Sequence, residues 1–440
     1  IYNKCIRNIN IKYVIILFTC IQILMVYSYY FLVGYDLTTL IKNSFELHKN
    51  NTLIDNWYFS TYPNNLLLLS LYSKIIYIVN IVGLEKYSYF LLLIVLCINC
   101  NFAGFLIYRI VQKITGRNIL SFLSYIYFLL LMYISPWYSI PYSDAIGTLF
   151  TTLTIGIYII YFNKHIYLKY VMLGIIGIIS LNIKPQASIV FIAIIIYELL
   201  LKIENIKIRL KNILLIFLGI IISLQIISIF NNNISVQLNS EQNIGYYHYF
   251  KMGLNQGTTG LYSSQDFDDS YSIKLREERD KFNKQQIENR IKDFTLTSYS
   301  QHILKKTLIN FNNGTFGWYW MAEFPNLENY IENKELNILQ NIYYGYGNYY
   351  KYFNCFQQSN WLVILLLTFI GIFNNRYIEY KIMFYLSIVG IFLFSIIFES
   401  SARYLFTNVP IFIICSMYGL QNLIEFKNRI IYKKRTRNKI

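Results

Sequence analysis

The chain has 440 residues, of which 55% are hydrophobic and 14% are charged, and its formal net charge is +16. Soluble domains carry about 25% charged residues, and the mean hydropathy here is positive, at +0.38. An ordinary soluble domain is therefore excluded. The charged residues are also clustered, which leaves long uncharged stretches between them.

These uncharged stretches predict membrane-spanning helices, because a span needs about 20 mainly apolar residues to cross a hydrocarbon core about 30 Å thick. We expect an all-α integral membrane protein with about ten transmembrane helices. The first follows a basic head without a small-residue cleavage site, so we expect an uncleaved anchor. The predicted spans lie near residues 12–33, 87–110, 119–136, 145–163, 166–183, 186–202, 212–231, 359–374, 381–398 and 404–422.

The positive charges predict the orientation, because cytoplasmic loops of membrane proteins are enriched in Lys and Arg. Basic residues concentrate in segments 109–117 and 202–211 and in the tail from Lys427. If the amino terminus is cytoplasmic, the predicted spans place all three of these segments on the cytoplasmic side of the membrane. We therefore expect a multi-pass cell-membrane protein with both termini in the cytoplasm, and no nucleic-acid partner is needed to explain the charge. The abundance of Ile, Asn, Lys and Tyr favours a bacterial source with an AT-rich genome.

The orientation of the later loops depends on residues 64–82. If this segment crossed the membrane, every later loop would lie on the opposite side of the membrane. Lys74 lies in the middle of this apolar segment, which favours a helix lying on the outer surface of the membrane. Four parts are predicted. An N-terminal transmembrane module spans residues 1–231, and its long first outer loop, residues 34–86, bears surface helices. A large outer loop or domain (232–358), C-terminal transmembrane helices (359–426) and a basic cytoplasmic tail (427–440) follow.

Four charged residues fall at span boundaries on the predicted outer face. Asp36 follows the first span, Asp144 precedes the fourth, Lys184 lies at the tip of a tight hairpin, and Arg403 begins the last span. Ionisable groups held at the membrane often mark a functional site, although both acids also fit helix caps and Arg403 fits a contact with headgroup phosphates. A carboxylate can take a proton from an acceptor hydroxyl, and Lys and Arg can neutralise a leaving phosphate. The pattern favours sugar transfer from a lipid-phosphate donor.

This layout resembles the GT-C superfamily of polyprenyl-phosphate-sugar-dependent glycosyltransferases, especially the family 39 group of protein mannosyltransferases and lipid A aminoarabinose transferases. The similarity lies in Asp36, in the first-loop segments SFELHKNN (44–51) and YFSTYPNNL (58–66), and in Asp144 after the third span. The resemblance implies an inverting transfer at the outer face, with Asp36 as general base and Asp144 supporting it. It implies a polyprenyl-phosphate sugar donor, a glycan, glycolipid or protein acceptor, and contact with membrane lipids.

The chain departs from the family where Leu37 follows Asp36, since many relatives have a second acid there, and where Tyr62 replaces a Lys before the surface-helix prolines. No cofactor is assigned, and a divalent metal is left open. The side chains expected to bind the donor phosphate are Lys184, Arg403, Asn64 and Asn65, and those expected near acceptor or sugar are Asp55, Tyr62 and His248.

Two other functions stay open. A polysaccharide polymerase or ligase with a lipid diphosphate donor would share this topology. A non-catalytic lipid or polysaccharide transporter would place charged or Pro/Gly-broken residues in mid-membrane. The spans contain Asn99, Asn101 and Gln225 but no expected buried acid or base, which disfavours transport. Cys97 and Cys100 lie within an apolar span, so we interpret them as structural.

Overall fold

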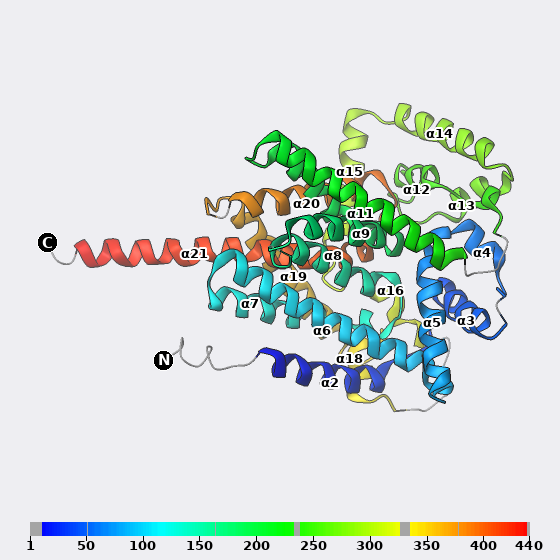
Figure 1. Cartoon of the computed structure of the whole chain (residues 1–440), viewed down its shortest axis with the longest axis horizontal. Helices are drawn as coiled ribbons and strands as arrows, with labels where there is room; N and C mark the ends of the chain where they lie inside the picture. The colour runs from blue at the N-terminus through cyan, green and yellow to red at the C-terminus, as the bar shows by residue number, and fades with distance from the viewer. Residues whose placement is uncertain are drawn as a thin grey trace.

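The computed structural model describes residues 11–50, 52–162, 164–232, 238–325, 335–376 and 378–437. All regular secondary structure in these residues is helical, as predicted. The long helices run in broadly similar directions, and the start of the first and the end of the last lie on the same side of the molecule (Figure 1). We call this side the terminal face and the opposite side the capped face.

Ten long helical segments overlap the ten predicted spans. Two of them, α7 and α10, continue into one turn of π-helix, to Tyr133 and Leu201 respectively. The segments are α2 (Ile11–Tyr29), α6 (Ser88–Thr115), α7 (Asn118–Phe128), α8 (Ser143–Ile159), α9 (Ile166–Ile183), α10 (Ile189–Ile196), α11 (Ile206–Asn232), α19 (Tyr350–Gly371), α20 (Ile378–Ile397) and α21 (Val409–Arg437). By length and composition alone, eight helices among the described residues could cross a membrane, and they include the segment Pro63–Ile81.

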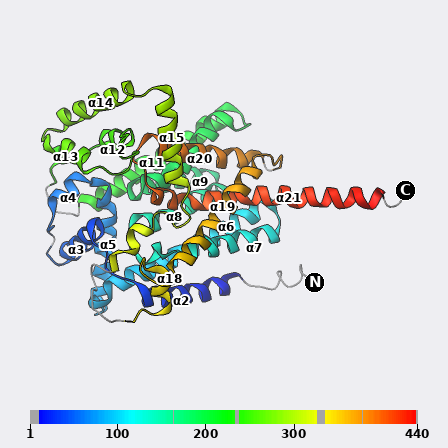
Figure 2. The same ribbon diagram turned by 180° about the vertical axis from the view of Figure 1, so that it is seen from behind.

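That segment contains α5 (Leu66–Ile81), which lies across the ends of the long helices at the capped face (Figures 1 and 2). It packs against α3 (Tyr35–Asn50). The Ser70 hydroxyl donates to the Phe230 carbonyl over 3.4 Å, and the Lys74 ammonium lies 3.5 Å from the centre of the Phe230 ring at the end of α11. This direction, across the long helices, is the one expected of the predicted surface helix.

A group of shorter helices, which includes α5 and which we call the cap, covers the capped face. Figure 2 shows it at the end of the molecule opposite the terminal face. The cap consists of α3, α4 (Asn56–Thr61), α5, α12 (Tyr246–Gly253), α13 (Ser264–Ser272), α14 (Arg276–Lys292) and α15 (Leu296–Phe311). Two further short helices, α16 (Tyr319–Ala322) and α18 (Ile338–Tyr343), complete the described part of segment 238–343.

Toward the C-terminus, the helix bounds of the structure differ from the predicted span and tail bounds. Helix α19 begins at Tyr350 rather than near residue 359, because Phe353, Gln357 and Trp361 recur on one buried stripe that hydropathy alone does not detect. The last span is preceded by the 3₁₀ segment η8 (Ala402–Asn408), so α21 starts at Val409, and its helix continues through most of the predicted tail.

Glycines allow two pairs of long helices to approach closely. A methyl group at Gly174 of α9 or Gly219 of α11 would overlap the backbone of the other helix, and Gly371 of α19 faces Gly419 of α21 in the same way. In lipid, helix association depends on van der Waals contact rather than on a hydrophobic driving force, and small residues make this contact possible. The glycines therefore fix how these helices pack.

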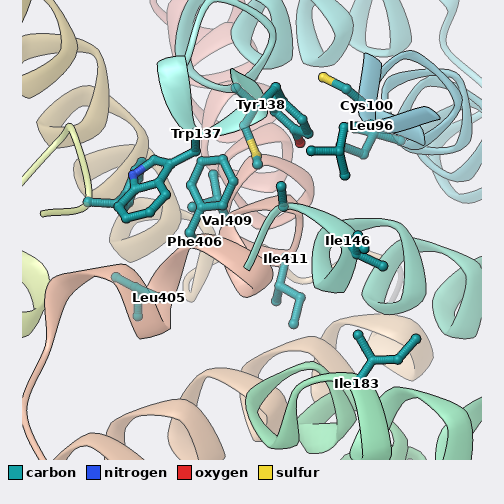
Figure 3. Close-up of a cluster of buried hydrophobic side chains, with 14 of the residues drawn as sticks. Leu96, Cys100, Trp137, Tyr138, Ile146, Ile183, Leu405, Phe406, Val409 and Ile411 are labelled. Atoms are coloured by element: carbon teal, nitrogen blue, oxygen red, sulfur yellow. The ribbon is translucent and has the colours of Figure 1, made fainter. Parts of the chain in front are cut away.

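An apolar cluster underlies the capped face (Figure 3). The rings of Trp137 and Phe406 lie 6.1 Å apart, and the Trp137 indole donates to the Thr315 carbonyl over 3.1 Å. Cys100 joins this cluster as a buried free thiol, as does Cys97 nearby, in agreement with a structural role. The cluster anchors segment 135–142 and η8, which carry the polar residues described next.

Candidate functional site

Charged side chains from four separate parts of the chain meet between the cap and the long helices. Two tyrosines lie at their centre. The Tyr142 hydroxyl donates to Asp36 Oδ2 over 3.3 Å, and the Tyr404 hydroxyl donates to Glu399 Oε2 over 3.1 Å. The Arg403 guanidinium lies 6.0 Å from the Tyr142 ring and 5.5 Å from the Tyr404 ring, and Lys184 Nζ lies 5.8 Å and 5.1 Å from the same two rings.

Asp144 and Lys184 form a buried ion pair, with Lys184 Nζ 2.7 Å from Asp144 Oδ1. Their side chains are only 1% and 8% exposed respectively. Asp144 lies in the first turn of α8 but accepts no hydrogen bond from a backbone N–H of the described residues, so the helix-cap interpretation was wrong. Burial lowers the pKa of Lys184, and the neighbouring Asp144 opposes that shift. The charge of Lys184 is thus already compensated within the protein.

Asp36 is exposed at the start of α3, on the surface of this group. The preceding residue, Tyr35, has a left-handed backbone with φ of 58°, which is costly for a residue with a Cβ. Strain of this kind gathers at functional sites. Burial, together with Tyr58 and Asp36, raises the pKa of Tyr142 well above its usual value, so Tyr142 stays protonated and can donate to Asp36.

The first-loop residues lie around Asp36 in two distinct ways. Asn65 is buried and donates to the Tyr58 hydroxyl over 2.7 Å, and Tyr58 lies near enough to Tyr142 to help burial raise the pKa of Tyr142. Asn64 is exposed, and the half-buried Tyr62 packs on Tyr58 with 5.2 Å between ring centres. Asn65 therefore supports the group from behind, whereas Asn64 and Tyr62 present surface toward solvent.

Two predicted residues lie apart from this group. Asp55 caps α4 by accepting the Tyr58 N–H over 2.9 Å. His248 is 1% exposed inside the cap, where Nδ1 contacts the Ser270 hydroxyl at 2.9 Å. Burial and Lys251 lower the pKa of His248 to about 3, so its ring is neutral at physiological pH. Both side chains serve the local fold of the cap.

Glu399 is a charged residue of this group that the sequence analysis missed. Burial raises the pKa of Glu399, and Arg403 opposes that shift. The sequence could have indicated Glu399, because this acid directly follows an apolar helix and lies four residues before Arg403 in the segment ESSAR. Arg403 itself forms no direct ion pair with a carboxylate of the described residues. Burial opposes the charge of Arg403, but the nearby carboxylates of Asp144 and Glu399 outweigh burial and raise the pKa of Arg403.

The segment that carries Glu399 and Arg403 is fastened to the cap by Lys306. Its ammonium donates to three carbonyls, those of Gly253, Ile396 and Phe398, over 2.7, 2.7 and 2.8 Å. The N–H of Ser401 also donates to Asn310 Oδ1 over 2.9 Å. The cap therefore determines where Arg403 lies relative to Asp36.

We expect Lys306→Met to lower the free energy of unfolding by at least about 2 kcal/mol, because buried carbonyls then lack a donor. Thermal unfolding in detergent measures this loss. Lys305→Met is the matched control, because Lys305 is exposed on the same helix. A melting temperature unchanged from that of the control would show that Lys306 does not hold the segment.

A buried acid lies at the opposite end of the long helices, contrary to expectation. Glu198 is fully buried, and it accepts hydrogen bonds from Tyr158 over 2.6 Å and from Lys202 over 2.9 Å. Its charge is paired and hydrogen-bonded, as buried charges require. Within the part of the chain that the structure describes, no three His, Cys, Asp or Glu side chains are placed to hold a metal ion.

Comparison with known proteins gives a family and no closer relative. Neither the search of curated proteins nor the search of solved structures found a significant match. A family model described as "conserved hypothetical integral membrane protein" matches residues 3–423, nearly the whole chain. The all-helical fold and the apolar helices agree with that description. The chain is therefore a multi-pass integral membrane protein and belongs to this family.

Proposed function

We propose that the protein is a membrane glycosyltransferase that moves a sugar from a polyprenyl-phosphate donor to a cell-envelope acceptor at the outer face of the membrane. One observation carries the proposal. An exposed carboxylate, Asp36, and an arginine without a direct ion pair among the described residues, Arg403, both lie beside Tyr142 where the long helices end. This is the boundary at which a lipid-linked phosphate is presented.

Asp36 has the properties of the general base. Its carboxylate is exposed and accepts one weak hydrogen bond, from Tyr142. In the reaction, the acceptor hydroxyl oxygen bonds to the anomeric carbon as the bond from that carbon to the phosphate oxygen breaks. The hydroxyl proton passes to Asp36, and attack opposite the leaving group inverts the anomeric centre.

Arg403 has the properties of the group that stabilises the leaving phosphate. Its planar guanidinium suits bidentate contact with phosphate oxygens, and stabilisation of charge that develops in the transition state accelerates the reaction. Lys184 lies near the same tyrosine rings, but its pairing with Asp144 makes it a positioning residue in this scheme. The exposed amide of Asn64 is a further phosphate donor on the first-loop side.

The test is release of free polyprenyl phosphate from a panel of polyprenyl-phosphate hexoses by the purified protein in detergent. We expect Arg403→Gln to lower kcat/KM by about 10²-fold or more, because one phosphate-stabilising group is lost. Arg276→Gln, which changes an arginine in α14 of the cap, is the control and should behave as wild type.

Matched polyprenyl-diphosphate sugars belong in the same panel. Turnover of these alone would reject the monophosphate donor in favour of a polymerase or ligase. An equal rate for Arg403→Gln and wild type would remove Arg403 from the mechanism.

A further inference from the structure

A second polar site lies at the terminal face, far from the cap. The end of α19, residues 373–376 after it and the α21 helix surround a cavity there of about 510 Å³. That volume falls in the range of small-ligand sites, roughly 300–1,000 Å³. The cavity is lined by Ile370, Phe373, Asn374, Asn375, Arg376, Asn422, Leu423, Glu425, Phe426 and Arg429, and we call it the terminal pocket.

The terminal pocket has an excess of positive charge. Glu425 pairs with Arg376 over 3.3 Å and with Arg117, the residue before α7, over 3.5 Å, so two cations share one carboxylate. Arg429 lines the pocket without an ion pair among the described residues. Beyond it, the sequence to the end of the chain contains further Lys and Arg residues and no acid. An anionic ligand would therefore be favoured.

The pocket also has an apolar side that is open to its surroundings. Phe373 is 67% exposed and Phe426 is 64% exposed. Leu423 lies one turn before Phe426 on α21 and is also exposed. Exposed apolar side chains of a membrane protein suit contact with acyl chains, and Arg429 lies where α21 changes from apolar to basic sequence. The two sides thus match a molecule with an anionic head and an apolar tail.

We propose that the terminal pocket binds an anionic phospholipid, with the headgroup phosphate between Arg376 and Arg429 and the acyl chains against Phe373 and Phe426. Basic pockets between helices at a membrane boundary recognise lipid phosphates in this way. The pocket lies at the opposite end of the long helices from the Asp36 group, so this proposal is independent of the glycosyltransferase function.

The experiment is a titration of the full-length protein, purified in neutral detergent, with dioctanoyl phosphatidylglycerol, followed by the melting temperature. A ligand that binds the folded state raises the melting temperature with its concentration. We expect a rise with this lipid and none with dioctanoyl phosphatidylcholine. Arg429→Gln should weaken the apparent affinity about tenfold, since a hydrogen bond to a charged group is lost, and Arg376→Gln/Arg429→Gln should weaken it further.

The matched control is Lys113→Gln/Lys207→Gln, which removes two exposed positive charges from the same face outside the pocket and should retain wild-type affinity. Equal losses in the control and pocket variants would reduce the effect to general surface charge and overturn the proposal. An equal response to inorganic phosphate would assign the pocket to free phosphate rather than to lipid. Arg429→Gln alone keeps the test valid if the double variant fails to fold.

Discussion

Replacement of Asp36 by Asn is expected to reduce the release of polyprenyl phosphate by about 10²–10⁴-fold, the usual contribution of a general base. The amide keeps the shape of the carboxyl group and can still accept the Tyr142 hydrogen bond. The protein should therefore fold normally and lose only the proton acceptor. The measurement is a rate of donor cleavage with saturating acceptor, beside a melting curve for each variant.

Asp55→Asn is the matched control for this replacement. Asp55 belongs to the same loop, but it caps α4, and Asn caps helices about as well as Asp. It should retain wild-type activity. A rate for Asp36→Asn equal to that of Asp55→Asn would show that Asp36 is not the base. Loss of activity in both would point to disturbance of the loop rather than to chemistry.

Replacement of Asp144 by Asn is expected to lower the free energy of unfolding by about 3–5 kcal/mol, because it leaves Lys184 charged and buried without its partner. The double variant Asp144→Asn/Lys184→Met removes the unpaired charge as well and should recover much of this loss. Thermal unfolding of the wild type, both single variants and the double variant completes a double-mutant cycle.

The cycle separates a structural pair from two independent residues. A large coupling energy would establish that Asp144 and Lys184 depend on each other. Simple addition of the two single effects would show that they do not, and Lys184 would then return as a candidate for direct contact with the donor phosphate. The activity of a well-folded double variant would also show whether the pair contributes to catalysis beyond holding its position.

The sequence was sufficient to predict the positions of the ten long helical segments, because apolar runs mark them. Seven of these segments are long and apolar enough to cross a membrane, whereas those that contain α7, α8 and α10 are shorter. Lys74 favoured a surface helix for residues 64–82, and α5 lies across the ends of the long helices, although this segment also has the length and composition of a span. The sequence failed at the start of α19, since a helix that buries one stripe of polar and aromatic residues has no continuous apolar run. A hydropathy profile does not detect helix ends that are determined by side-chain packing.

The candidate site was predictable only in part, for a related reason. The sequence placed Asp36, Asp144, Lys184 and Arg403 at span ends on one side, and the structure brings all four together. It could not show that two of them neutralise each other, because ion pairing depends on tertiary distance. Nor could it identify Lys306, whose three acceptors come from α12 and from the end of α20.

The glycine contacts have a consequence for biogenesis. Gly174 and Gly219 form the contact between α9 and α11, and Gly371 and Gly419 form the contact between α19 and α21. In each pair, the two helices are separated in the sequence by one other helix, α10 or α20. Neither contact can form while the chain has inserted only two of the three helices. Each triplet, α9–α11 and α19–α21, is therefore the smallest unit that can reach its final packing, and a ribosome-bound chain that ends after α10 or after α20 would leave a glycine face exposed to lipid.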